Sequence, residues 1–532
     1  MIVTHHIFLF LSSPSILLFS FFSLCGCGSV GIVSERVTRS HNRAINAQAH
    51  QASSKEHHHH ADALFWCQDL HYVGTVGWDG DLDPENPHNW SLPTKLTCTA
   101  QACAMVFVVA LSSSIFGPSA HVTAQQFGVA DDTMHLGVAL FVAGFAVGPL
   151  FFAPLSEVVG HMIPLCVGLA GVAIFQIPFA LAEDVKTMLI SRFLCGVIGS
   201  GAMAVGSGML AELWGPATRA VAIGLSGMFM NIGSTIGPIA GVYILERYGW
   251  RWTGWATLLV CIVVGFSAIF NLRETSSKKI LIQKARRLRR ETGNESMHTN
   301  SEKAGLSFQL LMRKHLTQPP RIFMMEPILI ILTIYLILVY GTLYLSYQMF
   351  SFAFLKRGWP HTTASLPFLA VALGLITAWI IFSVFTMTWY QSRFKQRGTV
   401  LPEDRLPTMI LGAVILPPAL TWFGWSMRTN AAPQILACFF IGMALQLIFM
   451  SGIVYIVDVY IACSNSAISI HVVVRSIVSA TFPLWAGPMY ENLGIEWSST
   501  VLAGFSAIML ASPILFSVYG AKIRSWKYLD KQ

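Results

Sequence analysis

Apolar stretches of roughly 20 residues recur along the chain from Lys95 onward, separated by short polar joints. At 1.5 Å per residue, a helix of about 20 residues crosses a hydrocarbon core of about 30 Å, so each stretch predicts one transmembrane helix. Twelve such helices are expected, at 96–116, 133–153, 162–182, 188–210, 220–244, 252–271, 327–350, 363–390, 407–426, 432–457, 465–487 and 497–520.

A long polar gap divides these stretches into two groups of six. Basic residues concentrate in this gap, and positively charged loops stay in the cytoplasm. We therefore expect an all-α membrane protein with two six-helix bundles around a central cavity. Its expected divisions are an N-terminal tail (1–94), a first bundle (95–271), a cytoplasmic basic linker (272–326), a second bundle (327–520) and a cytoplasmic tail (521–532).

The composition narrows the function classes. The 532 residues are 54% hydrophobic and 11% charged, whereas soluble domains carry roughly 25% charged residues. The net charge of +8 does not indicate nucleic-acid binding, because the basic residues lie in joints where they fix membrane orientation. The cysteines form no CxxC pair, and no catalytic or ligand cluster lies along the spans. We expect no enzyme activity, no cofactor and no metal site; His57–His60 is interpreted as a solvated low-complexity stretch.

The N-terminus departs from this plan. Residues 7–24 form an apolar run that resembles a signal peptide, interrupted by Ser12-Ser13-Pro14-Ser15. Cleavage after such a signal would place Asp83 outside, against the orientation set by the linker charges. The sequence favours an incorrectly assigned start or a weakly inserted segment.

Two charged residues within or beside spans are candidates for function. Arg192 lies in the apolar run of span four. A lone charge in a membrane span is costly and marks a functional site by default, although an arginine near a helix end can also snorkel to the interface. The tight joint 154–160 between spans two and three places the carboxylate of Glu157 at the membrane surface.

Span five carries small residues at helical spacing. Close helix packing is the expected consequence, with a kink where proline removes a backbone hydrogen bond. We interpret this stripe as a seal between the half-bundles; ordinary small-residue packing is the alternative. Its members are Gly224, Gly233, Gly237, Pro238 and Gly241.

These features resemble the major facilitator superfamily, and within it the fungal twelve-helix drug:proton antiporters, a branch with polyamine and cycloheximide-resistance exporters. The resemblance runs from about Asp83 to Arg524. It implies the major facilitator fold, alternating access and proton coupling that involves Arg192. Besides the span-five motif, it rests on 83–91, Glu326-Pro327, Tyr335, Tyr340-Gly341, Tyr344, 402–406, Tyr455, Asp458, Tyr460, Arg475 and 482–484.

Two positions depart from the family pattern. Val242 replaces the last glycine of the span-five motif. The joint after span two reads Gly160-His161-Met162 where the family has Gly-Arg-Arg or Gly-Arg-Lys. With an ordinary pKa of about 6.5, His161 predicts either pH-sensitive gating or weakened transport.

Proton coupling or gating is assigned to Arg192, Asp458, Glu157 and His161. Asp458 is equally well interpreted as a structural partner of Arg475, because both lie near the cytoplasmic ends of adjoining spans. In the superfamily, spans one, four, seven and ten line the cavity. The candidate lining residues are Gln101, Ser112, Tyr340, Tyr344, Gln348, Gln446 and Tyr455.

The function expected from these residues is export of drugs, toxins or secondary metabolites by proton antiport. Aromatic and uncharged polar lining groups favour a bulky, amphipathic or weakly cationic ligand. A polyamine exporter and a non-transporting sensor are the alternatives. The expected partners are a small-molecule substrate, protons and the lipid bilayer, in a monomer of the plasma membrane or, second, the vacuolar membrane.

Overall fold

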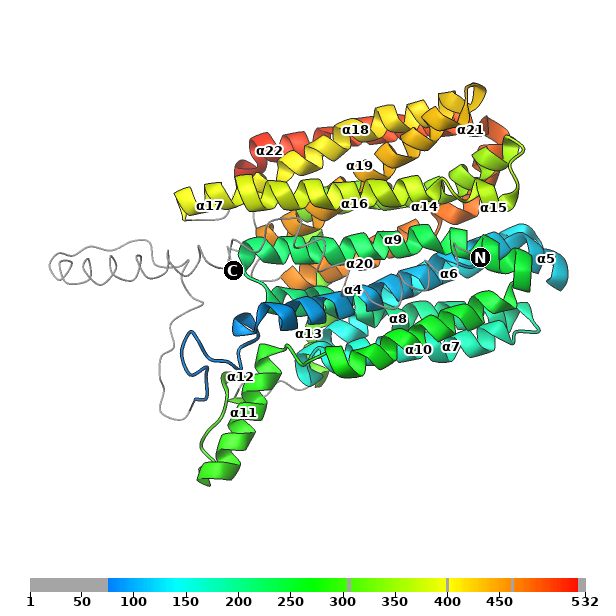
Figure 1. Ribbon diagram of the computed structural model, residues 1–532. Coiled ribbons are helices and arrows are strands. Elements are labelled where there is room, and N and C mark those ends of the chain that lie inside the picture. The colour runs from blue at the N-terminus through cyan, green and yellow to red at the C-terminus, as the bar shows by residue number, and fades with distance from the viewer. Residues whose placement is uncertain (1–74, 304–307, 399–400, 461–463, 525–532) are drawn as a thin grey trace.

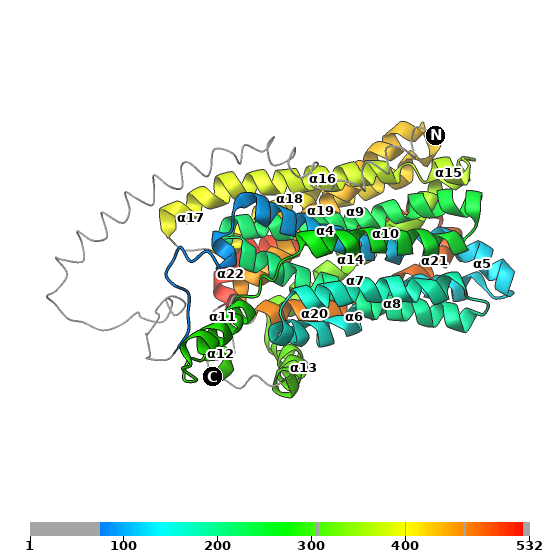
Figure 2. The same cartoon turned by 60° about the horizontal axis from the view of Figure 1, so that its bottom comes forward.

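The computed structural model describes residues 75–303, 308–398, 401–460 and 464–524. The apolar run at 7–24 and the histidine run His57–His60 lie outside the described residues. Long helices run roughly parallel in two groups that lie side by side (Figures 1 and 2).

The first group contains six long helices, with the short α5 (Ala120–Phe127) beyond the first of them. Each begins or ends within about a turn or two of the expected apolar stretch, because helices continue past the apolar core into the polar joints. They are α4 (Leu92–Ser114), α6 (Asp131–Val159), α7 (Met162–Ala180), α8 (Val185–Leu213), α9 (Pro216–Tyr248) and α10 (Arg251–Asn271).

The second group also provides six crossings, several of them built from two helical pieces. The first four are α14 (Pro327–Lys356), α16 (Phe368–Phe385) continued by α17 (Gln391–Arg397), α18 (Leu406–Trp425) and α19 (Ala431–Val459). The short α15 (His361–Ala364) precedes α16. The last two crossings comprise α20 (Ser464–Ser479), α21 (Phe482–Met509) and α22 (Ala511–Arg524).

The described residues form eleven continuous segments long and apolar enough to cross a membrane. The last of them, Ser466–Arg524, spans 59 residues, roughly 90 Å if helical and far more than one crossing needs. Within α21 the backbone leaves the helical region at Gly494, with φ 75° and ψ 168°, so the chain reverses there. This reversal divides the segment in two and gives the twelve crossings that the sequence predicts.

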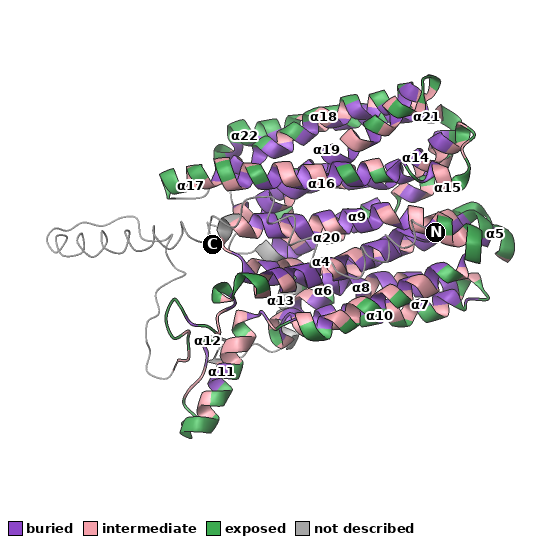
Figure 3. Ribbon diagram, in the orientation of Figure 1, coloured by how far each residue is buried: buried purple, intermediate pink, exposed green. Residues whose placement is uncertain are grey.

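Burial distinguishes the helices around the interface from those at the periphery. Most of α4 and α19 is buried, whereas α10 keeps exposed apolar side chains such as Phe266 and Phe270. An apolar exposed face is expected where lipid is the solvent. The two groups meet where α6 packs on α20 and α9 packs on α16, and Figure 3 shows buried residues concentrated along these inner helices.

Three helices connect the two bundles. They are α11 (Ser277–Thr292), α12 (Asn300–Lys303) and α13 (Phe308–Met325). The basic α11 projects from the end of the molecule at which α10 finishes (Figure 1). We call this end the linker side and the opposite end the far side.

Candidate functional site

A cavity of about 300 Å³ opens between the bundles toward the linker side. Helices α4, α6, α8 and α9 of the first bundle and α19 and α20 of the second contribute to its wall. The wall is mostly apolar and includes Val106, Phe145, Met230, Phe449 and Ile453, with Arg475 as a charged member.

A second cavity, of about 740 Å³, lies between the bundles on the far side. Tyr344, Tyr347 and Gln348 on α14 form part of its wall, and Pro238 of the glycine stripe forms another part. Two carboxylates, Glu246 on α9 and Glu491 on α21, lie at its edge and are exposed.

A layer of buried polar and aromatic side chains separates the cavities and joins the bundles. Asn231 on α9 donates from Nδ2 to Oε1 of Gln446 on α19 over 2.5 Å. One turn further along α9, the Thr235 hydroxyl lies 3.2 Å from the Tyr347 hydroxyl of α14. Each contact connects one half of the molecule to the other. Asn231 was not among the predicted site residues, although it is the one side-chain amide among the glycines of span five.

Tyr340, which was predicted to line the cavity, lies in the middle of this layer and lines neither cavity. Its ring stacks on Phe449, with centroids 6.1 Å apart, and its hydroxyl lies 3.4 Å from that of Tyr344. Phe449 lines the linker-side cavity and Tyr344 the far-side cavity. Tyr340 therefore lies between the two.

The remaining predicted lining residues divide into two sets. Tyr344 and Gln348 line the far-side cavity, and Gln446 belongs to the layer. Three others lie away from both cavities, because their helices turn those faces toward neighbours in the same bundle. Gln101 bonds to Val264 and Ser267 on α10, Ser112 accepts from Gln176 on α7, and the Tyr455 ring stacks on Phe516.

Arg192 is fully buried in the first bundle and does not snorkel to an interface. Its guanidinium donates to the backbone oxygens of Gly137, Ser112 and Ser113 over 2.6 to 3.1 Å. The ring of Phe141 lies 4.6 Å from its central carbon. These contacts bind α8 to α4 and α6. Within the described residues no carboxylate forms an ion pair with it.

The glycine stripe packs mainly inside the first bundle, which corrects the expected seal between halves. A Cβ at Gly233 would lie 2.4 Å from the Phe107 carbonyl oxygen, and one at Gly241 would lie 2.3 Å from that of Ile115. Both contacts are with α4. Only Gly224 faces the second bundle, with Met450 at 3.2 Å. The stripe thus holds α9 against α4 and shapes the wall that both cavities share.

The joint between α6 and α7 docks on the first residues of the linker. Gly160 has φ 87° and a Cβ there would meet the Glu274 carboxylate at 2.2 Å. Glu274 accepts from the His161 amide over 2.8 Å, and the His161 Nδ1 lies 3.0 Å from the Thr275 hydroxyl. Burial lowers the pKa of His161 against the opposing effect of nearby carboxylates. Glu157 pairs with Lys278 over 3.3 Å.

Asp458 pairs with Arg405 and not with Arg475. The Arg405 Nε lies 2.9 Å from the Asp458 carboxylate at the linker-side end of the second bundle. Asp404, beside Arg405, pairs with Arg393 and Arg397. Arg475 was expected near the same membrane surface as Asp458, but it lines the cavity and its guanidinium contacts the ring of Tyr340 in the layer between the cavities.

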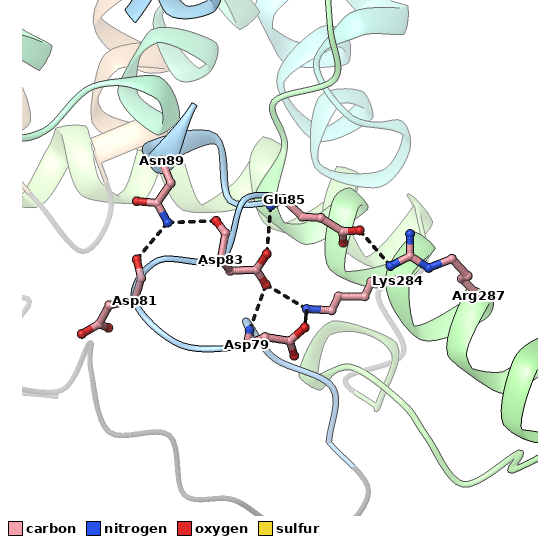
Figure 4. A network of polar contacts seen from close by, with 7 residues as sticks. All are labelled: Asp79, Asp81, Asp83, Glu85, Asn89, Lys284 and Arg287. Carbon is pink, nitrogen blue, oxygen red and sulfur yellow. Dashed lines mark hydrogen bonds and ion pairs between the residues drawn. The ribbon is translucent and has the colours of Figure 1, made fainter. Parts of the chain in front are cut away.

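The motif before span one docks on the linker (Figure 4). The Lys284 ammonium lies 2.8 Å from both Asp79 and the buried Asp83. Burial opposes ionisation of Asp83, but the bond from Lys284 and two backbone amides outweighs it and lowers the pKa to about 2. Arg287 pairs with Glu85 nearby. Asp83 therefore lies on the linker side, against the location expected after cleavage of a signal.

Comparison with known proteins agrees with this architecture. Residues 102–483 match the family model described as Major Facilitator Superfamily. The citrinin biosynthesis cluster MFS transporter of Monascus ruber is 40% identical over 85% of this chain and 91% of its own. The cercosporin MFS transporter of Cercospora nicotianae is 36% identical, with 85% and 88% covered.

The solved structures include a proton:xylose symporter bound to 6-bromo-6-deoxy-D-glucose. It superposes with a TM-score of 0.58 at 15% identity and covers 81% of this chain and 96% of its own. At that identity the likeness concerns the fold alone. The matched family model and the similar fungal transporters together show that this chain belongs to the major facilitator superfamily of membrane transporters.

Proposed function

We propose that the protein exports small organic molecules, and secondary metabolites in particular, by alternating access coupled to proton antiport. The observation that carries this proposal is the pair of cavities on opposite sides of a layer that bridges the bundles. Rocking the bundles would break the contacts Asn231–Gln446 and Thr235–Tyr347 and connect one cavity to the other side. The names of the similar proteins from Monascus and Cercospora support a metabolite as cargo.

The orientation belongs to the same proposal. The linker helix α11 carries Arg286, Arg289 and Arg290, and this positive charge supports a cytoplasmic location for the linker side. The linker-side cavity then collects substrate from the cell. We place the protein in the plasma membrane, as a monomer.

Proton coupling is proposed at the charged groups nearest the moving parts. Asp458 with Arg405 and Glu157 with Lys278 are ion pairs at the linker-side ends of the two bundles, where protonation of the carboxylate would release the cation. His161 is held neutral by its lowered pKa and gains charge only under acidic conditions. Arg192, satisfied by three carbonyls, transmits such changes by bracing α4, α6 and α8.

The test measures uptake of a panel of fluorescent organic dyes and labelled spermidine into inside-out vesicles that contain the full chain. An acidic lumen provides the proton gradient. Dye accumulation that a protonophore abolishes, and that Asp458→Asn or Glu157→Gln weakens, supports the proposal. Correctly inserted protein that binds a dye but accumulates nothing indicates a sensor, and accumulation of spermidine alone indicates the polyamine exporter.

The structure bears unequally on the two alternatives. The sensor was suggested by the altered joint Gly160-His161-Met162, yet that joint is fully docked on Glu274 and Thr275. The polyamine exporter needs carboxylates in the cavity. Those on the linker side, Glu157 and Glu212, lie at the mouth. The docked joint removes the reason for proposing a sensor, and the position of Glu157 and Glu212 favours a cargo other than a polyamine.

A further inference from the structure

Arg475 on α20 is a buried cation that faces the linker-side cavity. Its side chain is 5% exposed, and its central carbon lies 4.1 Å from the ring of Tyr340 and 5.1 Å from that of Phe449. Its Nε has no hydrogen-bond partner. Among the residues that the structure describes, no carboxylate lies within ion-pair distance of this guanidinium.

The other charged groups of this cavity are at its mouth and have partners. Glu157 pairs with Lys278, and Glu212 accepts the amide of Ser277 over 2.6 Å. His161 bonds to Thr275 and is neutral because burial lowers its pKa. Arg475 is therefore the charge at the inner end of the cavity that still lacks a counter-charge.

Arg192 shows how a buried arginine is satisfied when its role is to hold helices together. All three of its nitrogens donate to carbonyl oxygens, and it lines neither cavity. Arg475 has the same burial without those bonds. A buried charge left unpaired is costly, so the site is completed by an anion that enters the cavity.

The surroundings of Arg475 indicate the rest of such a ligand. Phe449 presents a ring beside the guanidinium, and the walls beyond it are apolar, with Met230, Met450 and Ile453 among them. A volume of about 300 Å³ suits a compact molecule with a flat apolar body.

We infer that the linker-side cavity binds small aromatic organic anions, with the carboxylate or ionised hydroxyl of the ligand against Arg475 and its ring against Phe449. This inference rests on the proposed export function and gives it a substrate class. It differs from the bulky, amphipathic or weakly cationic ligand that the sequence favoured. The arginine at the inner end of this cavity is a poor match for a polyamine, because like charges repel.

The test is equilibrium binding to the purified full-length protein, measured by fluorescence with three matched probes. They are 1-pyrenecarboxylate, its uncharged carboxamide and 1-pyrenemethylammonium, which share one ring system. The native protein is expected to bind the carboxylate at least about tenfold more tightly than either other probe. Equal or tighter binding of the amide or the ammonium, or no binding of the carboxylate, overturns the inference without any variant.

Two variants test whether Arg475 causes the preference for the carboxylate probe. Arg475→Gln should bring carboxylate affinity down to that of the amide and leave the amide within about twofold, while Arg475→Lys should retain part of the preference. A preference that survives in Arg475→Gln contradicts the assignment. A second aromatic carboxylate should displace the probe more effectively than excess chloride or inorganic phosphate. If the inorganic ions compete equally well, the site binds small ions and the inference is overturned.

Binding separates this inference from the proposed function. A carboxylate preference that depends on Arg475, without uptake into vesicles, leaves the substrate class standing and removes export. Uptake of neutral dyes, together with equal binding of the three probes, supports export and contradicts the proposed substrate class.

Discussion

The two cavities between the bundles differ in their charged groups. At the linker-side mouth, Glu157 pairs with Lys278 and Glu212 accepts a backbone amide. The linker-side cavity has Arg475 at its inner end, whereas the larger far-side cavity has the exposed carboxylates of Glu246 and Glu491 at its edge. An organic anion would be attracted on one side and repelled on the other. For a transporter that exposes one cavity at a time, this asymmetry favours loading on the linker side and release on the far side.

How deeply each charged group is buried determines how strongly it attracts or repels an anion. Arg475 is buried among aromatic rings, where an ionic contact is strong because water is excluded. Glu246 and Glu491 are exposed, where water and salt screen their fields. Changes on the linker side should therefore have the larger effects.

The largest effect is expected from reversing the buried charge. Arg475→Glu should lower vesicle uptake of the pyrene carboxylate by about 100-fold, since it replaces an attraction with a repulsion in a buried site. The pyrene ammonium should gain uptake. The control is Arg428→Glu, the same reversal at an exposed far-side arginine outside both cavities. Equal losses in the two variants would contradict the comparison.

A second prediction concerns the wall that both cavities share. Gly237→Ala places a Cβ 2.0 Å from the Ser114 hydroxyl oxygen and 3.0 Å from the Ile115 nitrogen of α4. Overpacking of this kind costs about 1–3 kcal/mol, seen as a lower thermal unfolding temperature in detergent. Gly227→Ala is the control, because its Cβ would meet nothing closer than Phe449 at 3.9 Å. If the two variants unfold alike, the stripe does not set the α4–α9 distance.

A third prediction concerns the docking of the linker helix α11, whose first residues form part of the linker-side cavity wall. Ser276 and Lys278 line that cavity at the start of α11, and Lys284 holds α11 to Asp83. Asp83→Asn removes a buried charge partner and should weaken this docking by about 1–3 kcal/mol. Hydrogen exchange should rise in α11 and in 79–89, while the exposed pair tested by Glu85→Gln contributes under about 1 kcal/mol.

The pH dependence of this docking has a defined sign. The pKa of Asp83 falls from 3.8 to about 2 in the folded protein. Its stabilising contribution is complete above pH 3.8 and disappears as the pH falls through about 2. Protection of α11, measured relative to the intrinsic exchange rate at each pH, should therefore stay constant from neutral pH to about pH 4 and fall only below it. A loss of protection that begins well above pH 4 would indicate that another group, such as His161, controls the linker instead.

The fold was predictable from the sequence because length and apolarity suffice to identify a membrane span. The turn at Gly494 is the instructive detail, because α21 is continuous through it and continuous helicity alone gives eleven segments in the described residues. The expected spans at 465–487 and 497–520 separated there because Glu491 and Glu496 flank the turn.

The cavity residues were harder to predict because rotation about the helix axis leaves little trace in a membrane span. Lipid-facing and core-facing sides are both apolar, so the pattern that orients a helix in a soluble protein is weak here. Gln101 was expected in the cavity and bonds to α10. Pairing of Asp458 with Arg475 was one of two equal interpretations, and the position of Arg475 beside the cavity came only with the packing of α20.

The smallest effect is expected at the far-side edge. The double variant Glu246→Gln and Glu491→Gln removes both exposed carboxylates. In this variant, pyrene carboxylate added from the far side should inhibit uptake about two- to threefold more strongly than in the native protein. The effect is small because exposed carboxylates repel an anion only weakly. The difference should disappear at an ionic strength of about 0.15 M, where the Debye length is about 8 Å. Glu183→Gln, a far-side carboxylate outside both cavities, should change nothing. A salt-independent or tenfold effect of the double variant would mean that these carboxylates contact the anion, and the far side would then be a second binding site instead of an exit.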